Sequence, residues 1–140
     1  MIRAVLDTNV LVAGLRSPNG ASDEILAQLR AGGWVLVLSN TVLGEYHEIL
    51  HREIILLGLR RAEVDSYIDA LCVLAERFSP VTRWQPAAED PDDEAIIQLA
   101  REAKVLYLVT HNVRDVSRAA QFGVRVVRPA EFLIILRQSK

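Results

Sequence analysis

The sequence predicts an α/β fold with three layers, in which a central parallel sheet lies between two layers of helices. Two observations support this fold class. Short apolar runs of strand length alternate with helical patterns along the chain, and glycine or proline residues separate them at turn positions. The 140 residues suffice for one buried core, and we expect a single domain over residues 1–140.

Four apolar runs, two of them interrupted by one arginine, predict buried strands, as expected for a parallel sheet covered by helices. In chain order they are Ile2–Leu6, Trp34–Leu38, Val105–Val109 and Val124–Val127. A shorter strand is expected over Phe78–Val81. Because helices separate the strands, the connections favour a parallel arrangement.

Helical patterns fill the intervals, and capping or breaking residues mark their ends. In chain order we expect helices over Val10–Leu15, Ser22–Ala31, Ser39–Leu57, Arg60–Arg77, from Asp90, over Asn112–Gln121 and from Pro129. Ser39 and Asp90 are good capping residues, and Pro91 suits the first helical position. Gly58 and Gly123 follow helix ends.

The composition is that of an ordinary soluble protein, with 51% hydrophobic and 24% charged residues. A net charge of −2 argues against a broad electrostatic grip on nucleic acid but allows a local basic patch. The single cysteine, Cys72, cannot form an internal disulfide, which favours a reducing compartment. Without a signal peptide or a membrane-length apolar run, we expect a cytoplasmic protein.

Asp7 is the most informative residue, because it follows the first strand directly and precedes Thr8 and Asn9. Ligands of parallel α/β sheets sit beyond the carboxyl ends of the strands. A carboxylate placed there is costly unless another group pairs with it. The alternative is that Asp7 caps the next helix, since Asp and Thr are both good N-cap residues.

Two further acidic sites lie on helices. Glu45 lies at the margin of the apolar stripe of its helix and can reach a cleft, whereas Glu48 lies opposite the stripe and is expected in solvent. In the acidic turn after Asp90, Asp92 and Asp93 project toward the buried side of the helix and Glu94 points away. The alternatives are a surface position for Glu45 and compensation of the helix dipole by the acidic turn.

A fourth site follows the third apolar strand. Thr110, Asn112 and Asp115 should share the sheet edge with Asp7, although Asn112 could instead cap the next helix. Four acidic sites at one edge would repel one another. Hard divalent cations such as Mg²⁺ and Mn²⁺ relieve this repulsion because they prefer oxygen ligands, and such a site suits phosphodiester hydrolysis.

These motifs resemble those of the PIN domain family. The resemblance rests on Leu6–Val10, Leu38–Asn40 with Glu45, Glu89–Glu94 with Ile96 and Ala100, Leu108–Asp115 and Val127–Leu133. It covers nearly the whole chain in the right order and is closest to the VapC-like toxins of toxin–antitoxin modules. It implies a ribonuclease that depends on Mg²⁺ or Mn²⁺, with RNA as substrate and an antitoxin protein as a partner.

The resemblance also implies the catalytic and metal-binding residues. They would be Asp7, Glu45 and Asp93, with Asp93 preferred over Asp92 because its spacing to Ile96 and Ala100 matches the family pattern. The chain departs from that pattern at Asn112, where many members have Asp. Either Asp115 is then the fourth catalytic and metal-binding acid, or Asn112 completes the site through its carbonyl.

The sequence supports roles for several other residues less strongly. The candidate substrate-binding residues are Thr8, Asn9, Thr110, Arg114 and Arg118, the two arginines as phosphate contacts. The apolar run Ile54–Leu57 exceeds what one sheet needs and indicates a homodimer or a partner surface. We expect His47 and His51 on a solvated helix face, His111 at the surface, and Trp34 and Trp84 in packing positions.

Two other functions compete with a ribonuclease. Because Asn112 stands where many family members have Asp, one alternative is a non-catalytic PIN scaffold that binds RNA or protein. A phosphatase could use Asp7 as its nucleophile, but that chemistry usually wants a second Asp two residues later, where this chain has Asn9.

Overall fold

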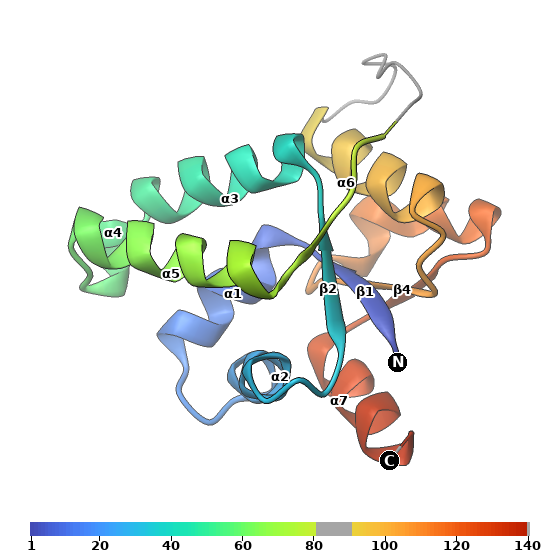
Figure 1. Cartoon of the computed structure of the whole chain (residues 1–140), viewed down its shortest axis with the longest axis horizontal. Helices are drawn as coiled ribbons and strands as arrows, with labels where there is room; N and C mark the ends of the chain where they lie inside the picture. The colour runs from blue at the N-terminus through green and yellow to red at the C-terminus, as the bar shows by residue number, and fades with distance from the viewer. Residues whose placement is uncertain (81–90, 140) are drawn as a thin grey trace.

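The structure, a computed structural model, describes residues 1–80 and 91–139, except for the side chains of Pro91 and Asp92. Within these residues, five parallel strands form one sheet in the order β3-β2-β1-β4-β5. Helices lie on both sides of this sheet (Figure 1). The predicted three-layer α/β/α fold with a parallel sheet is therefore confirmed.

The described elements alternate between strand and helix for most of the chain. The strands are β1 (Arg3–Leu6), β2 (Val35–Leu38), β3 (Glu76–Arg77), β4 (Tyr107–Val109) and β5 (Arg125–Val127). The helices are α1 (Thr8–Arg16), α2 (Ala21–Arg30), α3 (Asn40–Arg52), α4 (Ile54–Leu57), α5 (Arg61–Leu74), α6 (Pro91–Glu102), the 3-10 helix η1 (Val113–Phe122) and α7 (Pro129–Gln138). No helix in the described part of the chain is long and apolar enough to cross a membrane.

The register of the sheet aligns the carboxyl ends of its central strands. Leu6 of β1 lies level with Val109 of β4, and Val109 lies level with Val127 of β5. The ladder continues one residue further, because Asp7 N donates to Val109 O at 2.9 Å and Thr110 N donates to Val127 O at 2.9 Å. The residues that follow β1 and β4 therefore emerge together at one edge of the sheet.

Aromatic packing joins the N-terminal and C-terminal parts of the core. Trp34 is 2% exposed, and its Nε1 donates to Ile25 O of α2 at 2.8 Å. Its ring meets that of Phe132 on α7 edge-on, with 5.1 Å between the ring centroids and 87° between the planes. The predicted packing role of Trp34 is confirmed, whereas Trp84 lies outside the described residues.

Two predicted helices extend too far. The helix predicted over Ser39–Leu57 breaks at Glu53, whose φ of −96° and ψ of 8° separate α3 from α4. The helix predicted over Arg60–Arg77 ends at Leu74, and its last residues form β3, ahead of the strand expected over Phe78–Val81. Both residues of β3 are polar and exposed, so an apolar run could not have marked this strand.

The two ends of α6 were predicted from an apolar run that follows it and from a capping residue that precedes it. The strand predicted from Val105 begins at Tyr107, because Val105 N donates to Ala100 O at 3.2 Å and so closes the end of α6. Lys104 makes this turn with a left-handed φ of 56°. At the other end, α6 begins at Pro91 as predicted, while the expected cap, Asp90, lies outside the described residues.

Phe132→Ala should lower the free energy of unfolding by about 3–5 kcal/mol, because it removes a fully buried ring and leaves a cavity. The matched control is Phe122→Ala. Phe122 is 39% exposed and lies 4.4 Å from the Arg101 guanidinium, so its removal should cost about 1 kcal/mol at most. Urea unfolding measures both values, and equal losses would contradict the core described here.

Candidate active site

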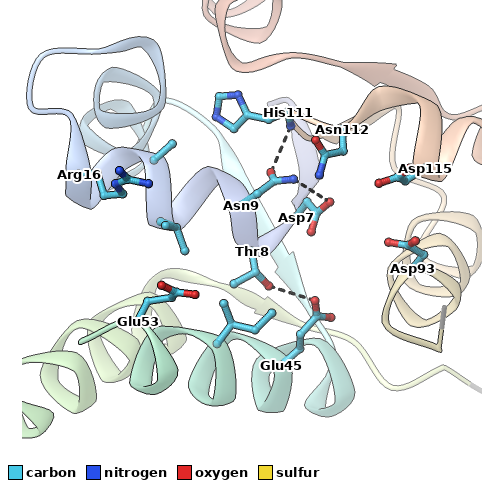
Figure 2. Close-up of a pocket in the computed structure, with 13 residues that line it drawn as sticks. Asp7, Thr8, Asn9, Arg16, Glu45, Glu53, Asp93, His111, Asn112 and Asp115 are labelled. Atoms are coloured by element: carbon cyan, nitrogen blue, oxygen red, sulfur yellow. Dashed lines mark hydrogen bonds between the residues drawn. The ribbon is translucent and has the colours of Figure 1, made fainter. Parts of the chain in front are cut away.

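A pocket of about 440 Å³ opens at the sheet edge where β1 and β4 end. Its described lining comes from α1 and the residue before it, from α3 and the residue after it, and from the first turn of α6. The segment that joins β4 to η1 and the start of η1 complete it. Figure 2 shows Asp7 near the centre, with Glu45 reaching up from α3 and with Asp93 and Asp115 facing the pocket from α6 and η1. The fold thus brings together segments that are far apart in the sequence.

The pocket contains every residue that the sequence predicts as catalytic or metal-binding. These residues are Asp7, Glu45, Asp93, Asp115 and Asn112. The first three are partly buried, whereas Asp115 and Asn112 are exposed. The prediction that Asp7, Glu45 and Asp93 converge in space is met by this placement, although their chemical roles remain predictions.

Asp7 occupies the N-cap position of α1, but its side chain makes no capping hydrogen bond. Its Oδ2 instead accepts hydrogen bonds from Thr110 Oγ1 at 2.8 Å and from Asn9 Nδ2 at 3.3 Å. Asn112 likewise occupies the N-cap position of η1 without a side-chain capping bond. The capping alternative therefore explains neither residue, since the main stabilising effect of a cap is that bond.

Asn9 and Thr110 form the frame that orients Asp7. Asn9 Nδ2 donates to Thr110 Oγ1 at 3.1 Å, and Asn9 Oδ1 accepts from His111 N at 3.1 Å. Thr110 Oγ1 also accepts from Asn112 N at 3.0 Å. Thr110, a candidate for substrate binding on sequence grounds, is fully buried and acts on Asp7 rather than facing the pocket.

A second set of contacts joins α3 to the end of β1. Thr8 Oγ1 donates to Glu45 Oε1 at 3.4 Å, and Tyr46 Oη donates to Leu6 O at 2.5 Å. Burial raises the pKa of the Tyr46 hydroxyl well above its ordinary value, and the negative charges of Asp7 and Glu45 raise it further. Tyr46 therefore stays a neutral donor beside two carboxylates.

The two arginines expected to contact phosphate do not line this pocket. Arg118 binds both carboxylate oxygens of Glu94, at 2.8 and 2.6 Å, and so joins η1 to α6. Glu94 was expected to point away into solvent, but its side chain is only 18% exposed because of this pair. Arg114 is exposed on η1.

Two residues at the other end of the pocket were not identified from the sequence. Arg16 of α1 and Glu53, just after α3, both line it (Figure 2). Helical spacing could have found them, since Arg16 lies seven residues after Asn9 and Glu53 lies eight after Glu45, each two turns along the same helix face. Among the described lining residues, Arg16 carries the only permanent positive charge.

The donor set fits a hard divalent cation. Asp7, Glu45, Asp93 and Asp115 contribute carboxylate oxygens to one open pocket, and Asn112 adds an amide carbonyl. Mg²⁺ and Mn²⁺ prefer such oxygen ligands. Like charges at this density disfavour one another, so a bound cation would relieve the repulsion among them.

Comparison with known proteins agrees with this fold. The sequence matches the family described as the PIN domain over residues 3–114, and the chain belongs to that family. A chain from the crystal structure of VapBC2 from Rickettsia felis, bound to a DNA fragment from their promoter, superposes with a TM-score of 0.62. The two chains are 15% identical over 91% of this chain and 98% of the other, so the likeness concerns the fold. No curated protein matches the sequence.

Two variants can show whether Asp115 or Asn112 is the fourth metal ligand of the site. If Asp115 is the fourth acid, Asp115→Ala should weaken Mn²⁺ binding more than Asn112→Ala does, because a charged oxygen attracts a dication more strongly than an amide carbonyl. Calorimetric titration of Mn²⁺ into each variant measures the difference. The reverse order would make Asn112 the ligand, and unchanged binding in both would leave a site of three acids.

Proposed function

We propose that residues 1–140 form a single PIN domain that acts as a metal-dependent endoribonuclease and hydrolyses RNA phosphodiester bonds. The observation that carries this proposal is that Asp7, Glu45, Asp93 and Asp115, from four separate segments, line one open pocket. Membership of the PIN family supports nuclease activity in general. The hydrogen bonds that Asp7 accepts, in place of a capping bond, indicate that its carboxylate is held for use in the pocket.

In this proposal Asp7, Glu45 and Asp93 hold Mg²⁺ or Mn²⁺, with Asp115 or Asn112 as the fourth ligand. Such an ion, when bound, supplies charge stabilisation and a nucleophilic water at neutral pH. Asn9 and Thr110 keep the Asp7 carboxylate in one orientation through their hydrogen bonds.

Substrate contacts are proposed from cationic and polar groups around the acids. Arg16 lies in the pocket at the end away from Asp93 and Asp115 (Figure 2), where it can pair with a phosphate of a bound strand. Thr8 and Asn9 line the same pocket, and the exposed Arg114 on η1 is a further phosphate contact. Arg118 is a weaker candidate because Glu94 already pairs with it.

We further propose that the protein is the toxin of a toxin–antitoxin pair, with an antitoxin protein as its partner. Support comes from its likeness in fold to a chain of a VapBC2 structure. A homodimer is proposed through α4, where Ile55 and Leu56 are 94% and 57% exposed. Large apolar side chains exposed side by side are typical of association surfaces.

The nuclease proposal is tested with Asp7→Asn in an RNA cleavage assay that contains Mn²⁺. We expect cleavage to fall at least about 100-fold, which corresponds to about 2.7 kcal/mol of lost transition-state stabilisation. The melting temperature in metal-free buffer should stay the same or rise, since one charge leaves a repulsive cluster. Glu48→Gln is the matched control, because Glu48 lies on α3 in solvent outside the pocket.

Chelation by EDTA should abolish wild-type cleavage, and added Mn²⁺ should restore it. Absence of RNA cleavage with any divalent metal would contradict the proposal and favour a non-catalytic PIN scaffold. A large loss of stability in Asp7→Asn would instead assign Asp7 a structural role. A phosphatase is disfavoured because Asn9, at the position of the required second acid, is engaged with Asp7 and Thr110.

A further inference from the structure

Two histidines and an aspartate form a cluster between α3 and α5. His47 and His51 are four residues apart on α3 and therefore lie on one face of that helix, and Asp65 lies on α5. Both histidines direct Nε2 toward Asp65 Oδ1, at 3.6 Å for His47 and 2.8 Å for His51. The expectation that both histidines are solvated holds for His47, whose side chain is 59% exposed, but not for His51, at 12%.

The geometry of this cluster is close to that of a tetrahedral metal site. One nitrogen from each histidine and one oxygen from Asp65 all lie within 4.8 Å of one another. Ligand atoms bound to one Zn²⁺ ion, with bonds of about 2.0–2.1 Å, are about 3.3 Å apart. The two observed separations from Asp65 Oδ1, 2.8 and 3.6 Å, lie within a few tenths of an ångström of this value. The separation between the two histidine nitrogens is at most 4.8 Å, and the exposed side chains of His47 and Asp65 are free to adjust it.

We propose that His47, His51 and Asp65 form a binding site for a zinc-class transition-metal ion, with water in the fourth position. Imidazole nitrogens favour zinc and its neighbours over Mg²⁺ and Mn²⁺, whereas the acid pocket offers oxygen ligands to the hard ions. None of the three residues lines that pocket. The proposal does not rest on the nuclease activity, and the two sites differ in the metal that each selects.

The position of this site gives the bound ion a structural effect. His51 lies near the end of α3 and Asp65 in the second turn of α5, so an ion held by both helices ties them together in addition to their apolar packing. A ligand that binds only the folded chain raises its stability by mass action. Because α3 also carries Glu45, zinc binding fixes the helix that contributes one acid to the pocket.

The test is a calorimetric titration of ZnCl₂ into the full chain in excess Mg²⁺, which occupies the oxygen-donor sites. His47→Gln and Asp65→Asn change exposed side chains, so both variants should fold. The matched control is Asp69→Asn, which removes an exposed carboxylate one turn further along α5. We expect His47→Gln and Asp65→Asn to weaken zinc binding at least tenfold, with Asp69→Asn unchanged.

Thermal unfolding gives an independent readout of the same site. Zinc should raise the melting temperature of the wild type and of Asp69→Asn, and should do so much less for His47→Gln and Asp65→Asn. Equal zinc affinity in all four proteins, or no binding in any of them, would overturn the proposal. The nuclease proposal would stand in either case, because its test uses Mn²⁺ and the Asp7 variant.

Discussion

The hydrogen bond from Thr110 Oγ1 to Asp7 Oδ2 joins the residues that follow two neighbouring strands, and the arrangement of the site depends on it. It forms because the register of β1 and β4 brings both strand ends to one level at the edge of the sheet. Asn9 then reaches Asp7, Thr110 and the His111 amide from the first turn of α1. A buried polar network of this kind specifies one arrangement only when its members find partners.

The acidic pocket lies directly against the apolar core of the fold. The carboxyl ends of β1 and β4 behind Asp7 are fully buried, and Tyr46, also buried, donates to the carbonyl just before Asp7. This rigid base holds Glu45 and Asp93 near Asp7 despite their mutual repulsion. The packed core offsets the unfavourable repulsion among the carboxylates of the pocket, as is common at functional sites.

Much of this arrangement could be predicted from the sequence. Short, mostly apolar runs predicted β1 and β2 to within a residue. The inward helix faces identified Glu45 and the pair Asp92 and Asp93, and the preference for Asp93 came from the resemblance to the PIN family. The polar strand β3 has no apolar pattern, and the pair between Arg118 and Glu94 depends on how η1 packs against α6. Contacts between helices, including the one between His51 and Asp65, are set by tertiary packing and leave little trace in local periodicity.

The central claim is that the fold gathers Asp7, Glu45 and Asp93 into a site for a hard divalent cation. The most direct measurement is anomalous X-ray scattering from crystals of the protein grown with MnCl₂. A manganese peak should lie in the pocket, within bonding distance of the Asp7, Glu45 and Asp93 carboxylates. A structure at saturating Mn²⁺ with no manganese among these carboxylates would contradict it.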